Sequence, residues 1–294
     1  EQKEENAFSV LLRASRTDAE TRKAITKLET FCHHFQRLFG LLEIETVLGS
    51  HRKSYQQDFT IDSGRSLTEW MQHYSHIQRD SLGLGEAPVP NLRDILEDKL
   101  DLKIFYFPLN TSVSGIFTYS SRLGGCILIN SNHPPGRRLF SLAHEFAHFL
   151  FDKKKLGLIS RVGSKDREEE IAEYFAENFL IPSQAIRDSF YECTRNKGKV
   201  SEEDVLYLAG LYGVSFKAMA VRLRRLRLIP LSAANRFIDE TKVSQLRAIT
   251  GLKEPDPANF PFPKSYLRLV IKAFRRKLIT TSALSEFLDI DLWS

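Results

Sequence analysis

The fold of this chain is decided by the stretch Ser141-Leu142-Ala143-His144-Glu145-Phe146-Ala147-His148-Phe149-Leu150, which contains the pattern H-E-x-x-H. Residues four apart share one face of a helix, so His144 and His148 can offer imidazole nitrogens to one metal ion. Glu145 can reach a water molecule on that metal without binding the metal itself, which is the position that a general base needs. The apolar residues around the motif, with no Gly or Pro among them, predict a buried helix. The motif therefore predicts a zinc-protease site that still lacks its third protein ligand.

The third ligand is expected on a second predicted helix, residues 167–182. Its apolar positions recur at helical spacing, and the pattern stops at Pro182. Glu168 and Glu169 lie on or beside this apolar stripe. Three other glutamates point away from it and are expected on a solvated acidic face: Glu170, Glu173 and Glu177. A carboxylate on a buried face is costly unless something pairs with it, and a zinc ion would do so. Periodicity alone leaves both Glu168 and Glu169 as candidate ligands.

The two helices resemble those of the ImmA/IrrE family of bacterial metalloproteases, whose members carry H-E-x-x-H followed by a helix of the form E-x-x-A-x-x-F-A-x-x-x-L-x-P. That form falls on six positions here: Glu169, Ala172, Phe175, Ala176, Leu180 and Pro182. The family's third ligand is the opening glutamate, so the resemblance implies that His144, His148 and Glu169 bind the metal. One departure is Glu173, where many relatives have Asn.

The resemblance covers about residues 60–230 and includes the short stretch Ser114-Gly115-Ile116. It implies an α+β fold with a zincin-like core. It also implies zinc as the cofactor, and sites of this kind can hold manganese instead.

Three short segments just before the H-E-x-x-H helix predict strands, because their apolar period is two or less: residues 102–107, 115–119 and 126–130. Gly124-Gly125 marks a turn between the last two. We expect a small antiparallel sheet, as in zinc proteases generally. Its edge strand, Gly124 to Asn130, is expected to pair with an extended peptide and lay the scissile bond over the metal. His133, in the loop that follows, is expected at the surface and not among the ligands.

Length and composition set the class of protein. With 294 residues and 42% hydrophobic content, the chain can bury a substantial core. No apolar run approaches the length that crosses a bilayer, and the N-terminus lacks the apolar core of a signal peptide. The three cysteines, Cys32, Cys126 and Cys193, form no C-x-x-C pair, which suits a reduced cytoplasmic protein. The net charge of +5 permits nucleic-acid binding but does not argue for it.

Four ranges are expected along the chain. Residues 1–66 form a helical N-terminal region and linker, residues 67–198 the metallopeptidase core, residues 199–254 a helix-turn-helix-like module and residues 255–294 a helical tail. Aromatic and aliphatic side chains recur at helical spacing in the first range, which favours a helix-packing face over a cofactor groove. Longer members of the ImmA/IrrE family carry a DNA-binding helix-turn-helix ahead of such a region.

The module at 199–254 carries arginines of the kind that a DNA-reading helix uses. Ser215 is expected to cap a helix from Phe216 to Leu226, after a turn at residues 212–214. The basic residues lie late on this helix instead of at its base-reading start: Arg222, Arg224, Arg225 and Arg227. We therefore favour a module that packs on the protease core and docks a substrate protein, with DNA binding as the alternative.

Together these features predict a zinc-dependent endopeptidase with Glu145 as its general base. The resemblance implies a narrow substrate range, namely a transcriptional repressor with a phage-type helix-turn-helix, whose cleavage switches on stress-response or mobile-element genes. The transition state needs a further hydrogen-bond donor, and spacing selects none of three candidates: Tyr106, Tyr119 and Arg161.

Two alternatives to this function remain, a DNA-binding regulator with a structural zinc site and a metal sensor without catalysis. A structural zinc site would usually have four ligands rich in Cys, and it would have no use for Glu145. The sensor shares every ligand with the peptidase, so it differs only in turnover.

Overall fold

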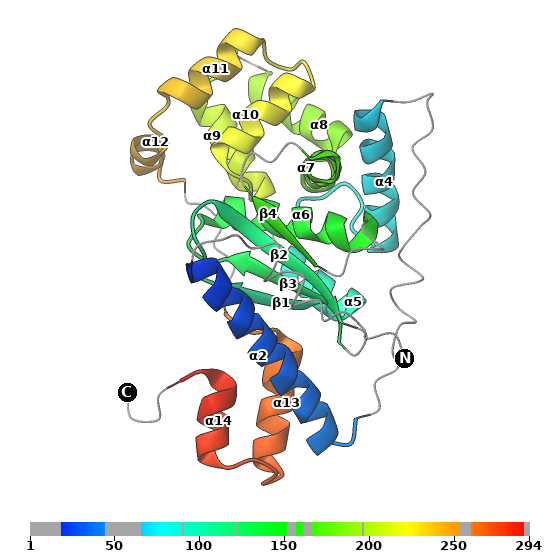
Figure 1. Cartoon of the computed structure of the whole chain (residues 1–294). Coiled ribbons are helices and arrows are strands. Elements are labelled where there is room, and N and C mark those ends of the chain that lie inside the picture. The colour runs from blue at the N-terminus through cyan, green and yellow to red at the C-terminus, as the bar shows by residue number, and fades with distance from the viewer. Residues whose placement is uncertain are drawn as a thin grey trace.

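The computed structural model describes residues 19–44, 66–89, 91–120, 123–151, 157–161, 166–195, 197–252 and 260–290. These residues form an α+β fold in which twelve helices surround one mixed sheet, so the predicted fold class is confirmed (Figure 1). The predicted linker ahead of residue 66 lies outside the described residues. The strands are β1 (Lys103–Phe107), β2 (Val113–Ser120), β3 (Gly124–Asn130) and β4 (Gly157–Arg161). The helices are α2 (Ala19–Leu41), α4 (Leu67–Ser81), α5 (Leu92–Leu100), α6 (Pro135–Phe151), α7 (Arg167–Leu180), α8 (Ser183–Thr194), α9 (Glu202–Tyr212), α10 (Phe216–Arg225), α11 (Leu231–Glu240), α12 (Val243–Thr250), α13 (Lys264–Arg275) and α14 (Thr281–Leu288).

The sheet has the strand order β1-β3-β2-β4 and is mixed, so the expected purely antiparallel sheet is wrong. β2 pairs antiparallel with β3 and with β4. β1 pairs parallel with β3, with Lys103 opposite Cys126 and Phe107 opposite Asn130. The turn at Gly124, whose φ of +79° suits glycine, determines only the β2–β3 hairpin. The partner of β1 is decided by burial of the whole strand, which no local pattern specifies.

β3 lies inside the sheet, so the expected edge position for Gly124 to Asn130 is also wrong. Its backbone pairs with β1 on one side and with β2 on the other. Every residue of β3 from Gly125 to Asn130 is buried, as a central strand covered on both faces requires. The edge strand on the β2 side is β4, a five-residue strand that the sequence pattern does not reveal. At the opposite edge, Tyr106 of β1 donates its backbone N–H to the carbonyl of Pro261.

Helices cover both faces of the sheet, and alternate residues of each strand face different layers. In β3, Ile127 and Ile129 pack with the core that contains α4 to α11, whereas Cys126 and Leu128 face α2 and α13. Figure 1 shows α6 and α7 on one side of the sheet and α2 with α13 and α14 on the other. The helices of the two terminal ranges therefore pack together on one face of the sheet.

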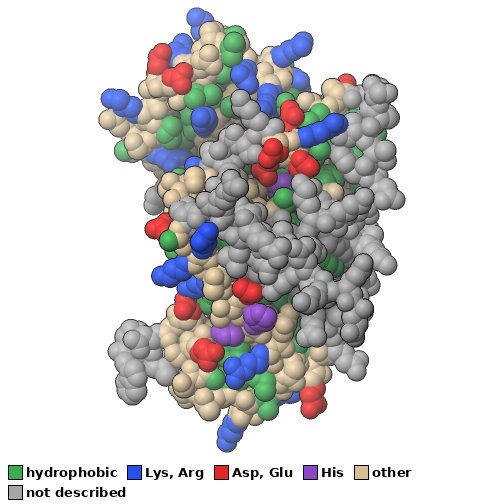
Figure 2. Space-filling view, in the orientation of Figure 1, with side chains coloured by type: hydrophobic (Ala, Val, Ile, Leu, Met, Phe, Trp, Pro, Cys, Tyr) green, Lys and Arg blue, Asp and Glu red, His purple; other side chains and the backbone are tan. Residues whose placement is uncertain are grey.

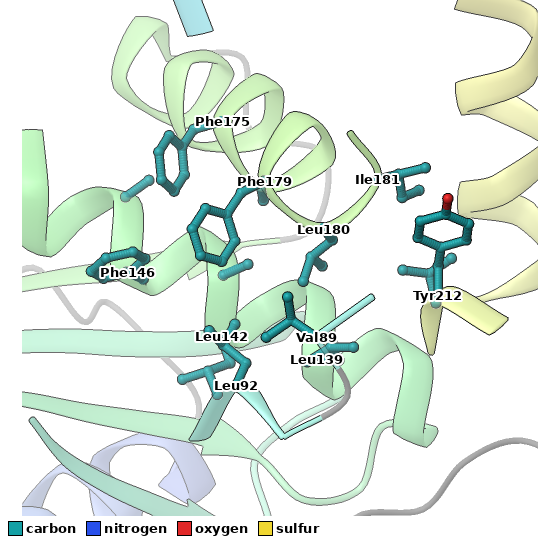
Figure 3. Close-up of a cluster of buried hydrophobic side chains, with 14 of the residues drawn as sticks. Val89, Leu92, Leu139, Leu142, Phe146, Phe175, Phe179, Leu180, Ile181 and Tyr212 are labelled. Carbon is teal, nitrogen blue, oxygen red and sulfur yellow. The ribbon is translucent and has the colours of Figure 1, made fainter. Parts of the chain in front are cut away.

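α6 and α7 pack through aromatic side chains at the spacing that predicted the two helices (Figure 3). Phe146 of α6 lies 5.9 Å from Phe175 and 5.6 Å from Phe179 of α7, measured between ring centroids. All three rings are fully buried. Edge-to-face contacts of this kind add about 0.5–1.5 kcal/mol to the stabilisation from buried area. This packing places the first turn of α7 beside the H-E-x-x-H motif.

The other end of α7 is held by two buried arginines. Arg79 of α4 donates to the carbonyl of Phe179, and Arg222 of α10 donates from Nε to the carbonyl of Ile181 at 3.0 Å. These bonds satisfy carbonyls that a helix end leaves without a partner. Arg222 also contacts Glu177, with 3.1 Å between Nη1 and Oε1, and Arg225 binds the same carboxylate. Glu177 is only 5% exposed, so its expected place on a solvated face is wrong, because two arginines compensate its charge.

Residues 202–225 form two helices joined by a short turn. α9 ends at Gly213, whose φ is +67°, and α10 begins after Ser215, whose hydroxyl accepts the N–H of Ala218 at 3.1 Å. The two helices are bent by 102° to each other. The guanidinium groups of Arg222 and Arg225 both contact Glu177 of α7. Among the described helices, none by itself has both the length and the hydropathy of a membrane crossing.

We expect Arg222→Met to lower the free energy of unfolding by about 3 kcal/mol, because it leaves a buried carboxylate with one partner fewer and a helix-end carbonyl unpaired. Adding Glu177→Leu should restore much of the loss, since no charge then remains to be compensated. Urea denaturation measures both values, with Arg224→Met as the matched control. Equal losses in the single and double variants would contradict this account of α7.

Candidate metal centre

The two histidines of the motif lie on one face of α6, as the spacing predicts. Their ring centroids are 4.9 Å apart. The His148 side chain is fully buried, and that of His144 is 13% exposed. α6 begins at Pro135, a residue favoured in the first turn, and it runs through both histidines without a break.

Glu169, in the first turn of α7, brings a carboxylate to both histidines. Its Oε2 lies 3.1 Å from Nε2 of His144, and its Oε1 lies 3.3 Å from Nε2 of His148. One ligand atom from each of the three residues lies within 4.8 Å of the other two. In a tetrahedral site with bonds of about 2.1 Å, neighbouring ligand atoms are about 3.4 Å apart, so this spacing suits zinc.

The charge state of Glu169 also suits a metal ligand. Burial by itself would raise the pKa of Glu169, but the hydrogen bonds and charges of His144 and His148 outweigh it and lower that pKa to about 2. Glu168, the other candidate from periodicity, is exposed and lies outside this cluster. The geometry therefore favours Glu169 over Glu168 as the third ligand, a choice that the helical period does not make.

Glu145 is fully buried, and neither carboxylate oxygen has a hydrogen-bond partner among the described residues. Burial raises the pKa of Glu145, while the charges of His148 and His144 act to lower it. A buried carboxylate without partners is destabilising, so the site suits a further group that can donate a hydrogen bond to it. A water molecule held by a metal at the His144–His148–Glu169 cluster would be such a donor.

Two residues outside the H-E-x-x-H motif, Gly115 and Ser160, shape the space around Glu145. A Cβ atom on Gly115 of β2 would lie 2.5 Å from Oε1 of Glu145, so only glycine leaves room for the carboxylate. Ser160 of β4 pairs with Gly115 across the sheet and is buried, although its hydroxyl does not reach hydrogen-bond geometry with Glu145. A glycine inside a strand signals close approach, and that signal was present in Ser114-Gly115-Ile116. Nothing in the sequence signals Ser160.

Two of the three candidate transition-state donors, Tyr106 and Tyr119, lie away from this site. Tyr106 lies two strands from Gly115 in register, roughly 10 Å away, and its ring packs under Arg93. Tyr119 is four residues along β2 from Gly115, about 13 Å away. The side chain of Arg161 lies outside the described residues.

His133 is also placed differently from its prediction. It is buried instead of exposed, with Nε2 3.1 Å from the carbonyl oxygen of Thr111, and burial lowers its pKa. It lies outside the His144–His148–Glu169 cluster.

Comparison with known protein families identifies a domain in this chain. Residues 97–224 match the model described as the IrrE N-terminal-like domain. The chain therefore contains an ImmA/IrrE family domain. The matched range contains both histidines, Glu145 and Glu169, and the family is one of zinc metallopeptidases, so a metallopeptidase-like function and zinc as the metal are supported. No curated protein matches the chain.

Figure 2 shows acidic side chains gathered beside a histidine in the upper half of the molecule. The matched domain covers the sheet and helices α6 to α9 with most of α10, whereas α2 and α13 lie outside it. The candidate ligands therefore all belong to the family domain, and the helices on the opposite face of the sheet do not.

Metal titration of two neighbouring variants tests the assignment of the third ligand. Glu169→Ala should weaken zinc binding by at least tenfold, because one of three protein ligands is lost. Glu168→Ala should change it only slightly, because this residue is exposed and lies outside the His144–His148–Glu169 cluster. A larger loss of zinc affinity for Glu168→Ala than for Glu169→Ala would show that Glu168, one residue earlier, is the third ligand.

Gly115→Ala should abolish peptide cleavage while zinc binding and folding remain, because the three atoms nearest to the new methyl group all belong to Glu145. The carboxylate would turn away from the metal, and the ligands would stay in place. The matched control is Gly210→Ala, where a Cβ atom meets nothing within 4 Å. Cleavage and metal content are measured for both variants. Full activity of Gly115→Ala would contradict this role of the glycine.

Proposed function

We propose that this ImmA/IrrE protein is a zinc-dependent endopeptidase that acts inside the cell. His144, His148 and Glu169 hold the metal, and Glu145 is the general base. The observation that carries this proposal is the buried Glu145 carboxylate, which has no hydrogen-bond partner among the described residues and lies beside three metal-ligating side chains. A purely structural zinc site gives no reason to keep such a group in place.

Zinc, when bound, would activate a water molecule by lowering its pKa toward about 7 and would polarise the peptide carbonyl. Glu145 takes a proton from the attacking water and passes it to the leaving amine as the C–N bond breaks. Burial supports this exchange, because a raised pKa brings the carboxyl group closer to neutral pH. Gly115 and Ser160 set the position of the carboxylate from the β2–β4 side.

β4 is the strand that would take the substrate backbone. It is the sheet edge nearest the candidate site, because its Ser160 lies opposite Gly115, whose added Cβ atom would contact Glu145. An extended peptide can add to an exposed sheet edge through backbone hydrogen bonds. This placement replaces the expectation for β3, which has partners on both sides. The cut is then expected in a linker or a locally unfolded stretch of the substrate.

The proposed substrate is a transcriptional repressor with a phage-type helix-turn-helix, whose cleavage would switch on stress-response or mobile-element genes. The support is the family resemblance, together with a module at 199–254 whose α10 packs on the core. Because Arg222 and Arg225 hold α7, we expect a folded substrate to contact Arg224 and Arg227, which lies just after α10. DNA binding by the module is less favoured for the same reason.

The test incubates the wild-type chain, Glu145→Gln and His148→Ala with the repressor encoded beside this protein and with casein as a generic unfolded substrate. We expect zinc in the wild type and Glu145→Gln but not in His148→Ala, and repressor cleavage by the wild type alone. Casein should stay largely intact, because binding at a short edge strand gives little affinity without docking.

Three other outcomes have distinct meanings. Zinc binding without cleavage of any substrate would favour the metal sensor over the peptidase. Rapid cleavage of casein would contradict the narrow substrate range. Cleavage of the repressor by Glu145→Gln would overturn the role of the general base.

A further inference from the structure

The C-terminal helix pair repeats an earlier part of the chain. Residues 265–289 align with residues 215–239 without a gap, at a constant offset of 50. Eight of these 25 positions are identical: Ser215 and Ser265, Arg225 and Arg275, Leu228 and Leu278, Ile229 and Ile279, Ser232 and Ser282, Ala233 and Ala283, Phe237 and Phe287, Asp239 and Asp289.

The two segments also share one backbone geometry. A left-handed residue lies two positions after the last residue of each helix: Arg227 with φ +57° follows α10, and Lys277 with φ +58° follows α13. Each of these residues donates its N–H to the carbonyl three positions back at 2.9 Å. Five equivalent pairs are buried: Phe216 and Tyr266, Ala220 and Val270, Leu223 and Ala273, Ile229 and Ile279, Phe237 and Phe287. In Figure 1 the α10–α11 and α13–α14 pairs lie at opposite ends of the molecule.

The repeats differ in what their basic face contacts. In α10 this face carries Arg222 and Arg225, which hold Glu177 and the last carbonyls of α7. The equivalent residues of α13 are Lys272 and Arg275, so both positive charges are retained. Both are exposed, and neither has an ion-pair partner among the described residues. The same face of the repeat is thus occupied in α10 and open in α13.

Apolar side chains border the open face. Ile271 is 49% exposed, Phe274 is 39% exposed and Leu278, just after α13, is 42% exposed. Together with Arg268, Lys272 and Arg275 they form what we name the α13 surface. A helix that carries carboxylates and apolar residues would match it in charge and in hydrophobicity. Phosphate groups of nucleic acid would match only the charges, since direct phosphate contacts do not need exposed Ile and Phe.

We propose that the α13 surface binds the C-terminal end of an acidic helix from a partner protein, in the way that α10 binds the end of α7. The model for the partner is α7 itself, in which Glu173 and Glu177 are four residues apart and both contact Arg225. Lys272 has an ammonium group where Arg222 has a guanidinium group that can donate two hydrogen bonds to one carboxylate. Binding of a helix to the α13 surface is therefore weaker than the α10–α7 contact and is reversible, as suits a separate partner. The proposal does not depend on peptidase activity.

The probe is a labelled alanine-based helical peptide with two glutamates four residues apart near its C-terminus and leucines beside them. Fluorescence anisotropy measures its binding to the full chain at roughly physiological salt. Lys272→Glu/Arg275→Glu should weaken binding by at least tenfold, and a peptide with lysines in place of the glutamates should bind this variant better than the wild type. The matched control, Lys217→Glu/Lys242→Glu, makes the same change of charge at exposed positions elsewhere and should leave binding unchanged.

Further measurements distinguish the acidic helix from other possible ligands of the α13 surface, namely nucleic acid and a second copy of this chain. Ile271→Ser/Phe274→Ser should weaken peptide binding, and circular dichroism confirms that each variant folds. A 20-base-pair duplex that binds more tightly than the peptide, and that is insensitive to the Ser variants, would assign the surface to nucleic acid and overturn the proposal. A dimer of this chain that dissociates in Lys272→Glu/Arg275→Glu would assign it to a second copy. Failure of the wild type to bind the peptide at millimolar concentration would also overturn it.

Discussion

The packing of α7 against α6 is the constraint on which the candidate metal centre depends. His144 and His148 come from one helix and are aligned by its period, but Glu169 reaches them only because Phe175 and Phe179 lock α7 onto Phe146. Buried arginines from α4 and α10 hold the far end of α7 through its carbonyls. Helices α4 and α10 therefore help to fix the position of Glu169. Substitutions in these helices, far from the candidate ligands, are expected to disturb the candidate metal site.

The second constraint is the close approach of β2 to Glu145. A buried carboxylate without hydrogen bonds is destabilising. The fold leaves room for the Glu145 carboxylate because position 115 is a glycine, where any side chain would displace that carboxylate. Destabilising groups that the surrounding structure holds in place are typical of functional sites. The same strand pair makes β4 the sheet edge beside Glu145, so the proposed general base and the proposed path of the substrate have one structural origin.

The repeat at an offset of 50 gives one local geometry two different uses. In α10 the basic face makes contacts inside the fold. It neutralises the charge of Glu177 and donates hydrogen bonds to the carbonyls at the end of α7. In α13 the apolar stripe of the repeat packs on α2 and the sheet, and its basic face has no such internal role. The sequence of a repeat fixes its helices and its turn, whereas the elements around it decide which face stays open.

The sequence by itself determined the α+β class, both helices of the site, His144, Glu145 and His148, because these depend on periods of two to four residues. It also narrowed the third ligand to two neighbours, and family resemblance selected Glu169. It did not determine the parallel pairing of β1, the central place of β3, the edge strand β4 or the burial of Glu177 and His133. Each of these depends on contacts between residues far apart in the chain, such as Glu177 with Arg222 or Tyr106 with Pro261. Local propensity carries no information about such partners, so only the tertiary structure decides them.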